Sequence, residues 1–190
     1  LSVLAATRLR ATQLPCKNVS VGSTPTALSA QMLEGVTEVR AGVYVLFDLV
    51  MTNVGVCTTE DIALSVLTTV IGHQRDKGWA IVDAGWMAMS RDRGTQNQSH
   101  DYGYGQVCDS NGKLLNYHMS GANQEHGIIS HVNPSCTADI SAELPIGTLL
   151  RILPNHACAT GAQFPAYQVV ESTDEGSPAL GPTWPRFYGW

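Results

Sequence analysis

Two side chains near the C-terminal end could bind a metal ion together: His156 and Cys158, in the sequence PNHACAT (154–160). An imidazole nitrogen and a thiolate are ligands that suit zinc. The apolar run before them predicts a β-strand, and side chains two residues apart on a strand point to the same side. Two protein ligands would leave coordination positions open, as Lewis-acid catalysis requires. The alternative is a buried thiol beside a hydrogen-bonded histidine, and the spacing alone favours that alternative.

A second candidate site lies in KNVSVGSTPTALSAQMLEG (17–35). A short β-branched run is followed by Gly22, Ser23 and Thr24, and then by a helical pattern that ends at Gly35. Ser23 or Thr24 suits the N-cap, the proline that follows suits the first helical position, and glycine suits the end. Backbone N–H groups at such a helix start can bind an anion. The alternative is a simple connector without a ligand.

The next segment, TEVRAGVYVLFDLVM (37–51), predicts a buried strand because it is apolar and rich in β-branched residues. A strand, a helix and a second strand form a β-α-β unit, which normally belongs to a parallel sheet. Tyr44 would then lie beside the loop at Gly22–Thr24, where its phenol could donate to a phosphate. The alternative for Tyr44 is a half-buried aromatic side chain without a ligand.

From about Ala63 onward the pattern changes to short strand-like runs separated by turns. The sequence DSNGK (109–113) predicts a hairpin, since Asn-Gly favours the type I′ turn. The second part of the chain therefore predicts an antiparallel β domain. Within it, GANQEHG places three polar residues between glycines, as is typical of a pocket lining or of an ordinary polar turn: Gln124, Glu125 and His126.

The composition of the 190-residue chain limits the possible functions. The formal net charge is −5 without a Lys/Arg block, which argues against nucleic-acid binding, and no stretch is long and apolar enough to predict a membrane span. Charged residues make up 14%, against about 25% in typical domains, so we expect a partner to cover part of the surface. The five cysteines are scattered and odd in number, which favours free thiols in a cytoplasmic protein over a disulfide framework.

The order of these motifs resembles one family. VSVGSTPT, EVRAGVYVLFD, VDAGW, QEHG and RILPNHAC are similar to the second half of the D-serine dehydratase and D-threonine aldolase type enzymes. These are fold-type III pyridoxal-phosphate enzymes, and the resemblance is strongest to their 3-hydroxyaspartate dehydratase branch. It implies an α/β plus β fold: residues 1–60 as the last β/α units of an alanine-racemase-like (β/α)8 barrel, and residues 61–190 as a β-rich, metal-binding domain.

The resemblance also implies roles for individual residues. The cofactor phosphate would be bound by Gly22, Ser23, Thr24 and Tyr44. The metal, zinc or else manganese or cobalt, would be bound by His156 and Cys158. Residues near the substrate pocket would be Gln124, Glu125 and His126. A 3-hydroxyaspartate substrate needs a cation for its second carboxylate, and the candidates are Arg91, Arg93 and Arg151.

One departure from the family pattern concerns catalysis. The family's Schiff-base lysine lies early in the barrel, and Lys17, Lys77 and Lys113 do not stand in a matching context. Activity would therefore need the N-terminal half of the same enzyme, either in one longer chain or as a separate chain, and the complete enzyme is expected to be a homodimer.

The implied reaction removes water from a D-3-hydroxy amino acid, such as 3-hydroxyaspartate or D-serine, to give a 2-oxo acid and ammonia. A metal-dependent aldolase is the alternative, although aldolases tend to place an acidic ligand after the histidine. A non-catalytic module that holds zinc is a second alternative.

Overall fold

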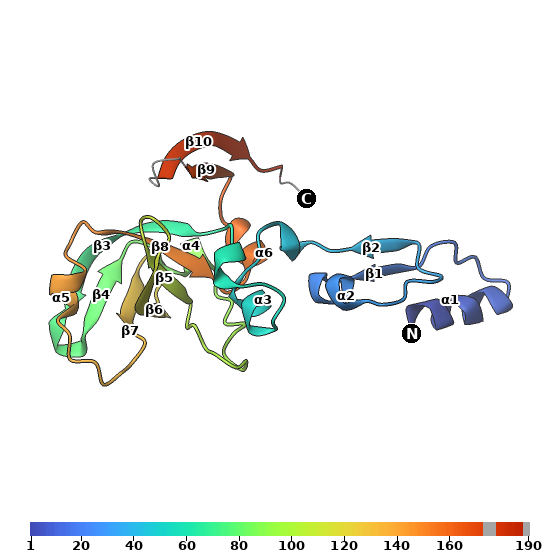
Figure 1. Ribbon diagram of the computed structural model, residues 1–190, viewed down its shortest axis with the longest axis horizontal. Helices are drawn as coiled ribbons and strands as arrows, with labels where there is room; N and C mark the ends of the chain where they lie inside the picture. The colour runs from blue at the N-terminus through green and yellow to red at the C-terminus, as the bar shows by residue number, and fades with distance from the viewer. Residues whose placement is uncertain (173–177, 188–190) are drawn as a thin grey trace.

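The computed structural model describes residues 1–172 and 178–187. It consists of an extended N-terminal arm, residues 1–45, joined to a β-barrel (Figure 1). The helices, with 3-10 turns marked η, are α1 (Ser2–Ala11), α2 (Thr24–Ser29), η1 (Val43–Val45), α3 (Leu49–Asn53), η2 (Thr59–Asp61), η3 (Arg75–Lys77), α4 (Trp86–Met89), α5 (Ile140–Glu143) and α6 (Ala157–Gly161). The strands are β1 (Ser20–Gly22), β2 (Glu38–Arg40), β3 (Val66–Gln74), β4 (Trp79–Val82), β5 (Gly105–Asp109), β6 (Leu114–Ala122), β7 (Gly127–His131), β8 (Leu149–Pro154), β9 (Ala166–Ser172) and β10 (Pro178–Pro185).

Six antiparallel strands close into a barrel in the order β3-β4-β7-β6-β5-β8. Closure pairs both edges of the sheet, and inward side chains alternate with outward ones along each strand. The barrel core consists mainly of aliphatic side chains: Val66, Val70, Val82, Val107, Met119, Ile129, Leu150 and Ile152. The expectation of an antiparallel β domain in this part of the chain is confirmed.

The hairpin predicted at Asp109–Lys113 joins β5 to β6, but its turn type differs from the prediction. The N–H of Asp109 donates to the carbonyl of Lys113, which leaves a three-residue loop. Gly112 has a φ of +91°, whereas Asn111 has no positive φ, so the turn is not type I′. The Asp109 carboxylate accepts from the N–H groups of Asn111 and Lys113, and this side-chain contact favours the longer loop.

The arm contains the predicted β-α-β unit, with β1 and β2 pairing in parallel around α2. The helix is shorter than predicted: it ends at Ser29, whose hydroxyl donates to the carbonyl of Pro25, and Gly35 lies beyond it in a loop. Gly35 has a φ of +80°, and a Cβ there would come within 2.7 Å of the Val3 side chain, so it is required by a close approach to α1 rather than by the end of α2.

The prediction of a buried strand over 37–51 is wrong for most of that segment. Only β2 is extended, all three of its residues are exposed, and η1 and α3 follow it. The apolar run becomes helical because the Asp48 carboxylate caps α3 by accepting the N–H of Met51.

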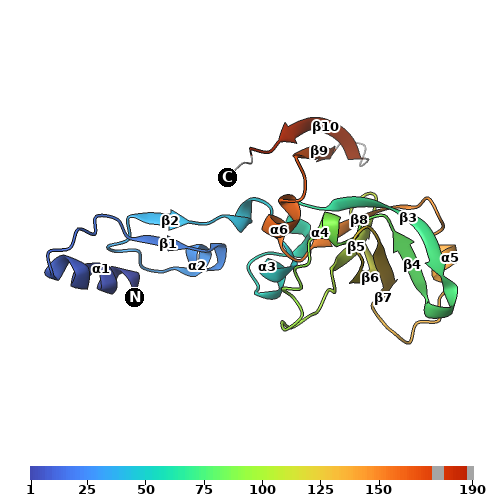
Figure 2. The same ribbon diagram turned by 180° about the vertical axis from the view of Figure 1, so that it is seen from behind.

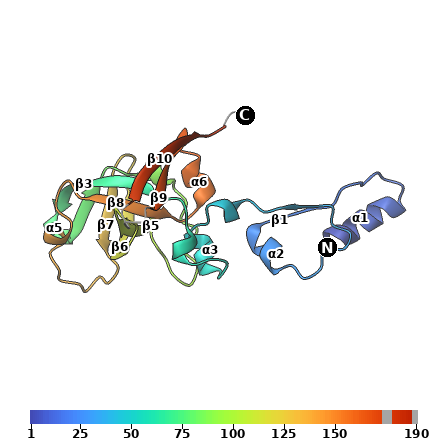
Figure 3. The same ribbon diagram turned by 45° about the horizontal axis from the view of Figure 1, so that its top comes forward.

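Figures 1, 2 and 3 show the arm, the barrel and a C-terminal hairpin from three directions. The arm extends from one end of the barrel and is joined to it through η1 and α3. The hairpin β9–β10 lies beside α6, where the Arg186 guanidinium donates to the carbonyls of Gly161 and Phe164. Among the described residues, no helix has the length and apolar character to cross a membrane.

Candidate metal and cofactor site

His156 and Cys158 lie at the start of a helix, so the prediction that they share one face of a strand is wrong. β8 ends at Pro154, His156 is the N-cap of α6, and Cys158 lies in the first turn. The N–H of Ala157 donates to the Asp48 carboxylate, a contact that turns the chain into the helix. Cys158 is an exposed free thiol, so the alternative of a buried thiol does not hold.

The His156 ring is oriented by a carboxylate that the sequence did not indicate. Its Nδ1 lies 2.6 Å from Oδ2 of Asp92, and Oδ1 of Asp92 accepts from the N–H of Gly94 at 2.7 Å. A carboxylate accepts, so Nδ1 carries the proton and the lone pair of Nε2 is left for another partner. Both side chains are part-exposed, at 43% for His156 and 32% for Asp92. This is the arrangement in which histidine commonly binds a metal.

A buried asparagine next to His156 holds the loop that carries Asp92. The Asn155 side chain donates to the carbonyl of Asp92 at 3.1 Å and to that of Gly103 at 2.7 Å. Its Oδ1 accepts from the hydroxyl of Thr95 at 3.3 Å, and both side chains are at most 2% exposed. A buried polar network of this kind is rigid when its members are paired, so it fixes Asp92 relative to His156.

Asp48 links the arm side of the molecule to the same segment. It is 1% exposed, and its two oxygens accept the N–H groups of Met51, at 3.0 Å, and Ala157, at 2.9 Å. The N–H of Val50 also donates to the carbonyl of Asn155. One carboxylate therefore caps both α3 and α6.

The structure places Tyr44 beside the loop at Gly22–Thr24, as expected, but through its backbone. The N–H of Tyr44 donates to the hydroxyl of Thr24 at 3.1 Å, and Thr24 is 1% exposed. Tyr44 as a whole is 53% exposed. Ser23, with a φ of +89°, uses its N–H on the carbonyl of Arg40 and its hydroxyl as the N-cap of α2. The loop therefore offers fewer free N–H groups than the sequence predicted, and the Ser23 hydroxyl already donates to that of Thr26 at 2.9 Å.

Gln124, Glu125 and His126 form the exposed turn between β6 and β7, and the structure ties this turn to α4 rather than to His156. The carbonyls of Asn123 and Gln124 accept the N–H groups at the start of α4. α4 in turn contacts α6, because the Thr160 hydroxyl donates to the carbonyl at the end of α4. The turn is thus connected to the His156 segment through α4.

Asp83, at the end of β4, is a charge close to His126. Burial would raise the pKa of Asp83, but hydrogen bonds from the Thr68 hydroxyl and the Thr69 N–H outweigh it. The nearby His126 acts in the same direction, and the pKa of Asp83 is lowered. Asp83 is therefore a stable anion at neutral pH.

The three candidate arginines have different partners. Arg91 stacks on the ring of Trp86 at 4.3 Å. Arg93 forms an ion pair with Asp101 at 3.0 Å. Arg151 donates through Nε to a serine hydroxyl and lines a hollow on the outside of the barrel, of about 460 Å³.

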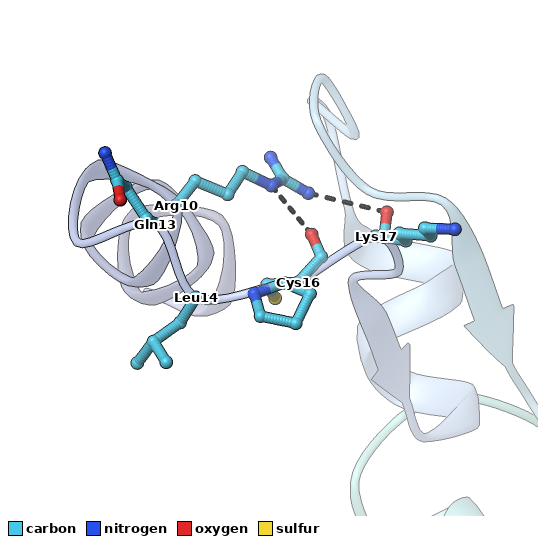
Figure 4. Close-up of a pocket in the computed structure, with 6 residues that line it drawn as sticks. Arg10, Gln13, Leu14, Cys16 and Lys17 are labelled. Atoms are coloured by element: carbon cyan, nitrogen blue, oxygen red, sulfur yellow. Dashed lines mark hydrogen bonds between the residues drawn. The ribbon is translucent and has the colours of Figure 1, made fainter.

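A hollow of about 550 Å³ lies on the arm beside Arg10, whose guanidinium donates to the carbonyls of Cys16 and Lys17 (Figure 4). Neither this hollow nor the one beside Arg151 includes His156 or Cys158. Within residues 1–172 and 178–187, no group of three or more His, Cys, Asp or Glu side chains is placed to hold a metal. Any metal bound by His156 and Cys158 would need further ligands from elsewhere.

The family model described as "Putative serine dehydratase domain" matches residues 63–170. D-threo-3-hydroxyaspartate dehydratase from Delftia sp. strain HT23 is 66% identical over 189 residues, which cover 99% of this chain and 48% of that protein. D-serine dehydratase from Dictyostelium discoideum is 32% identical over 164 residues, 83% of this chain and 40% of that protein. The chain thus spans about half the length of the relatives it matches.

Solved structures match over the whole chain. A histidine-to-alanine variant of D-threo-3-hydroxyaspartate dehydratase has a TM-score of 0.89 and 65% identity over 100% of this chain and 48% of that one. A cysteine-to-alanine variant in the metal-free form has a TM-score of 0.88 with the same identity, over 100% of this chain and 49% of that one. The two substituted positions are two residues apart.

An alanine racemase-like protein from Idiomarina loihiensis has a TM-score of 0.84 and 46% identity, over 98% of this chain and 48% of that one. The predicted fold class, the end of an alanine-racemase-like barrel followed by an antiparallel β domain, is confirmed. The chain belongs to the serine dehydratase domain family.

Proposed function

We propose that this chain is the C-terminal half of a pyridoxal-phosphate- and metal-dependent dehydratase of D-3-hydroxy amino acids. The substrate class is D-threo-3-hydroxyaspartate or D-serine, and the products are a 2-oxo acid and ammonia. One observation carries the proposal: His156 is held by Asp92 so that Nε2 is available, and the exposed thiol of Cys158 follows two residues later, in a chain 66% identical to a hydroxyaspartate dehydratase.

His156 and Cys158 are the proposed metal ligands, and the donor set fits. An imidazole with one nitrogen on a carboxylate and a free thiol suits zinc, with manganese or cobalt as alternatives. A divalent ion bound here supplies Lewis-acid polarisation of the substrate hydroxyl. Asp92 keeps the His156 proton on Nδ1, so that Nε2 would be the nitrogen that binds the metal.

Gly22, Ser23, Thr24 and Tyr44 are the proposed ligands of the cofactor phosphate. The fit is supported by the exposed positions of Ser23, which precedes Thr24, and of Tyr44, whose N–H donates to the Thr24 hydroxyl. Pyridoxal phosphate, when bound, supplies the electron sink for loss of the Cα proton. These residues position it, and the lysine that moves the proton belongs to the N-terminal half.

The substrate pocket is proposed to include the turn at Gln124, Glu125 and His126, which reaches the His156 segment through α4. Arg91 is the preferred partner for a second substrate carboxylate. Arg93 is paired with Asp101 and Arg151 lies beside the outer hollow, whereas Arg91 immediately precedes Asp92 and stacks on an aromatic ring. The proposal also covers the organisation of the protein. The boundary between the two units lies near residue 60, the complete enzyme is a homodimer, and it is located in the cytoplasm.

An assay of the complete enzyme tests the proposal. Incubated with D-threo-3-hydroxyaspartate, pyridoxal phosphate and a divalent metal, it should form ammonia and oxaloacetate in equal amounts. Replacing His156 by alanine should abolish the reaction while leaving the cofactor absorbance band. Glycine plus an aldehyde as the sole products would identify an aldolase, and metal binding without a cofactor band would identify a zinc-holding module.

A further inference from the structure

The segment 44–48 connects the two proposed binding sites, and it is held by hydrogen bonds at three points. We call it the 44–48 connector. At its first residue, the N–H of Tyr44 donates to the Thr24 hydroxyl at 3.1 Å. At its centre, the carbonyl of Leu46 accepts the N–H of Ala63 at 2.8 Å. These contacts join the connector to the loop at Gly22–Thr24, the proposed phosphate site, and to Ala63, which precedes β3 of the barrel.

The last residue of the connector contacts residues 156–158, which carry the proposed metal ligands. Asp48 accepts the N–H of Ala157, the residue between His156 and Cys158, at 2.9 Å. The carboxylate is 1% exposed, and its other oxygen is occupied by the N–H of Met51. A buried carboxylate with each oxygen paired has little freedom to move, so it fixes the backbone between the two proposed ligands.

The connector also contains a strained residue. Phe47 has a φ of +50°, a conformation that is an outlier for a bulky side chain. Its N–H donates to the carbonyl of Val43 at 2.7 Å, and its ring packs on a small cluster formed by Leu49, Ile62, Cys108 and Leu153. Strain of this kind persists where the surrounding structure holds it, so the shape of the connector is set by its packing.

We propose that Asp48 is a positioning residue, and that the 44–48 connector sets the location of the metal relative to the cofactor phosphate. This inference rests on the proposed function. Thr24 and Ala157 are fixed to opposite ends of a segment of five residues, one at each proposed site. Because the metal must meet the substrate hydroxyl while the cofactor holds the same substrate, an error in this spacing would slow the reaction even with both groups bound.

The test uses the complete enzyme carrying Asp48→Ser. Serine is a good N-cap, so it can still accept the N–H of Met51 and cap α3, but it has no second oxygen to reach Ala157. Metal-free protein is titrated with Co²⁺, whose thiolate charge-transfer band reports binding to Cys158. We expect an affinity at least about tenfold lower than in the wild type. At saturating metal we expect kcat to remain about 100-fold low, with the affinity for pyridoxal phosphate unchanged.

Asp139→Asn is the matched control. Asp139 caps α5 with the same kind of contact, accepting the N–H of Ser141 at 2.9 Å, and α5 lies at the far end of the barrel from the arm (Figure 1). This variant should bind Co²⁺ and turn over as the wild type does, measured well below the melting temperature of each protein. Recovery of full kcat in Asp48→Ser at saturating metal would overturn the inference alone. Absence of Co²⁺ binding in the wild type would overturn both the inference and the proposed function.

Discussion

The residues that hold the candidate site are paired across long stretches of sequence. His156 meets Asp92, 64 residues earlier, and Ala157 meets Asp48, 109 residues earlier. Each contact is short and involves a carboxylate, a group whose hydrogen bonds are among the stronger ones in proteins. The chemistry of a two-residue motif is thus set by two acids that lie outside it.

Replacing Asp92 by asparagine should weaken metal binding at His156. The amide is neutral, and in one of its two orientations it presents an NH₂ group to Nδ1, so the ring loses the partner that fixes its proton. We expect a loss of about 10- to 100-fold in metal affinity, measured by competition with a chelator. Asp76→Asn, at an exposed position in η3, is the control and should have no effect. Equal affinity in the Asp92 variant would show that the ring does not need the carboxylate.

The cysteines should differ widely in reactivity. Burial raises the pKa of the Cys108 thiol to about 11, with Arg151 opposing and Asp109 adding to this shift, whereas Cys158 is exposed. At pH 8 only about one Cys108 thiol in a thousand is a thiolate, the reactive form. Iodoacetamide should therefore label Cys158 first and Cys108 only after denaturation, as read by peptide mass spectrometry.

Zinc provides the internal comparison for that labelling experiment. It should protect Cys158 but not the half-buried Cys136, which lies outside the candidate site. Labelling of Cys158 at the same rate with and without zinc would count against its role as a ligand.

For single residues, the sequence revealed those with reactive side chains but not those that orient them. His156 and Cys158 are conspicuous because two ligand types stand two residues apart. Asp48 and Asp92 lie in segments where an aspartate is equally expected as a helix cap or a turn residue, and Asp48 is indeed a cap. A pairing over 64 or 109 residues has no local pattern, so no spacing rule could have found it.

At the scale of elements, backbone contacts decide how the pieces of the site meet. α4 begins against the turn between β6 and β7, where the carbonyls of Asn123 and Gln124 accept its first N–H groups. This contact is possible because Gly85 has no side chain: a Cβ there would lie 2.4 Å from both carbonyl oxygens. A glycine at this point therefore lets the polar turn and the His156 segment be held by one short helix.

Gly85→Ala should separate that turn from α4. The added methyl group meets two backbone oxygens that cannot rotate away, so we expect a loss of stability of about 2 kcal/mol, measured as the free energy of unfolding in urea. Gly72→Ala is the matched control in β3, where a Cβ meets nothing within 4 Å and φ is not positive. That variant should change stability by less than about 1 kcal/mol. A similar loss in both variants would contradict the role given to the contact.

Elements with a repeating pattern were predicted well, and those set by a single contact were not. The antiparallel domain and the parallel β-α-β unit follow from alternating apolar runs and from strand and helix patterns. The expected strand over 37–51 failed because one cap, Asp48 on Met51, outweighed a β-branched composition. The strand expected to continue through His156 ended at Pro154 for the same reason, a cap on Ala157 from the same carboxylate.

At the scale of the whole molecule, the arm and the barrel differ in how much they bury. The barrel has a continuous core, whereas in residues 1–45 the buried apolar side chains are Ala6 and Val19. Large apolar side chains of the arm face solvent: Leu4, Leu28, Met32, Val39 and Val45 are between 42% and 86% exposed. An arm of this composition gains little from burial, since hydrophobic stabilisation scales with the apolar area removed from water.

Hydrogen exchange should therefore divide this chain into two parts with different protection. Amides of β1, α2 and β2 should exchange with an opening free energy near zero, whereas those of β3 to β8 should require about 5 kcal/mol or more, because they open only with the barrel. When the N-terminal half is supplied, by co-expression or as a complete enzyme, the amides of the arm should become protected. The apolar side chains that face solvent in the arm would then be buried against the added β/α units, while protection in the barrel should stay the same. Strong protection of β1 and β2 in the chain by itself would mean that the arm is stable without a partner, and that its exposed apolar side chains are not the surface on which the proposed N-terminal half packs.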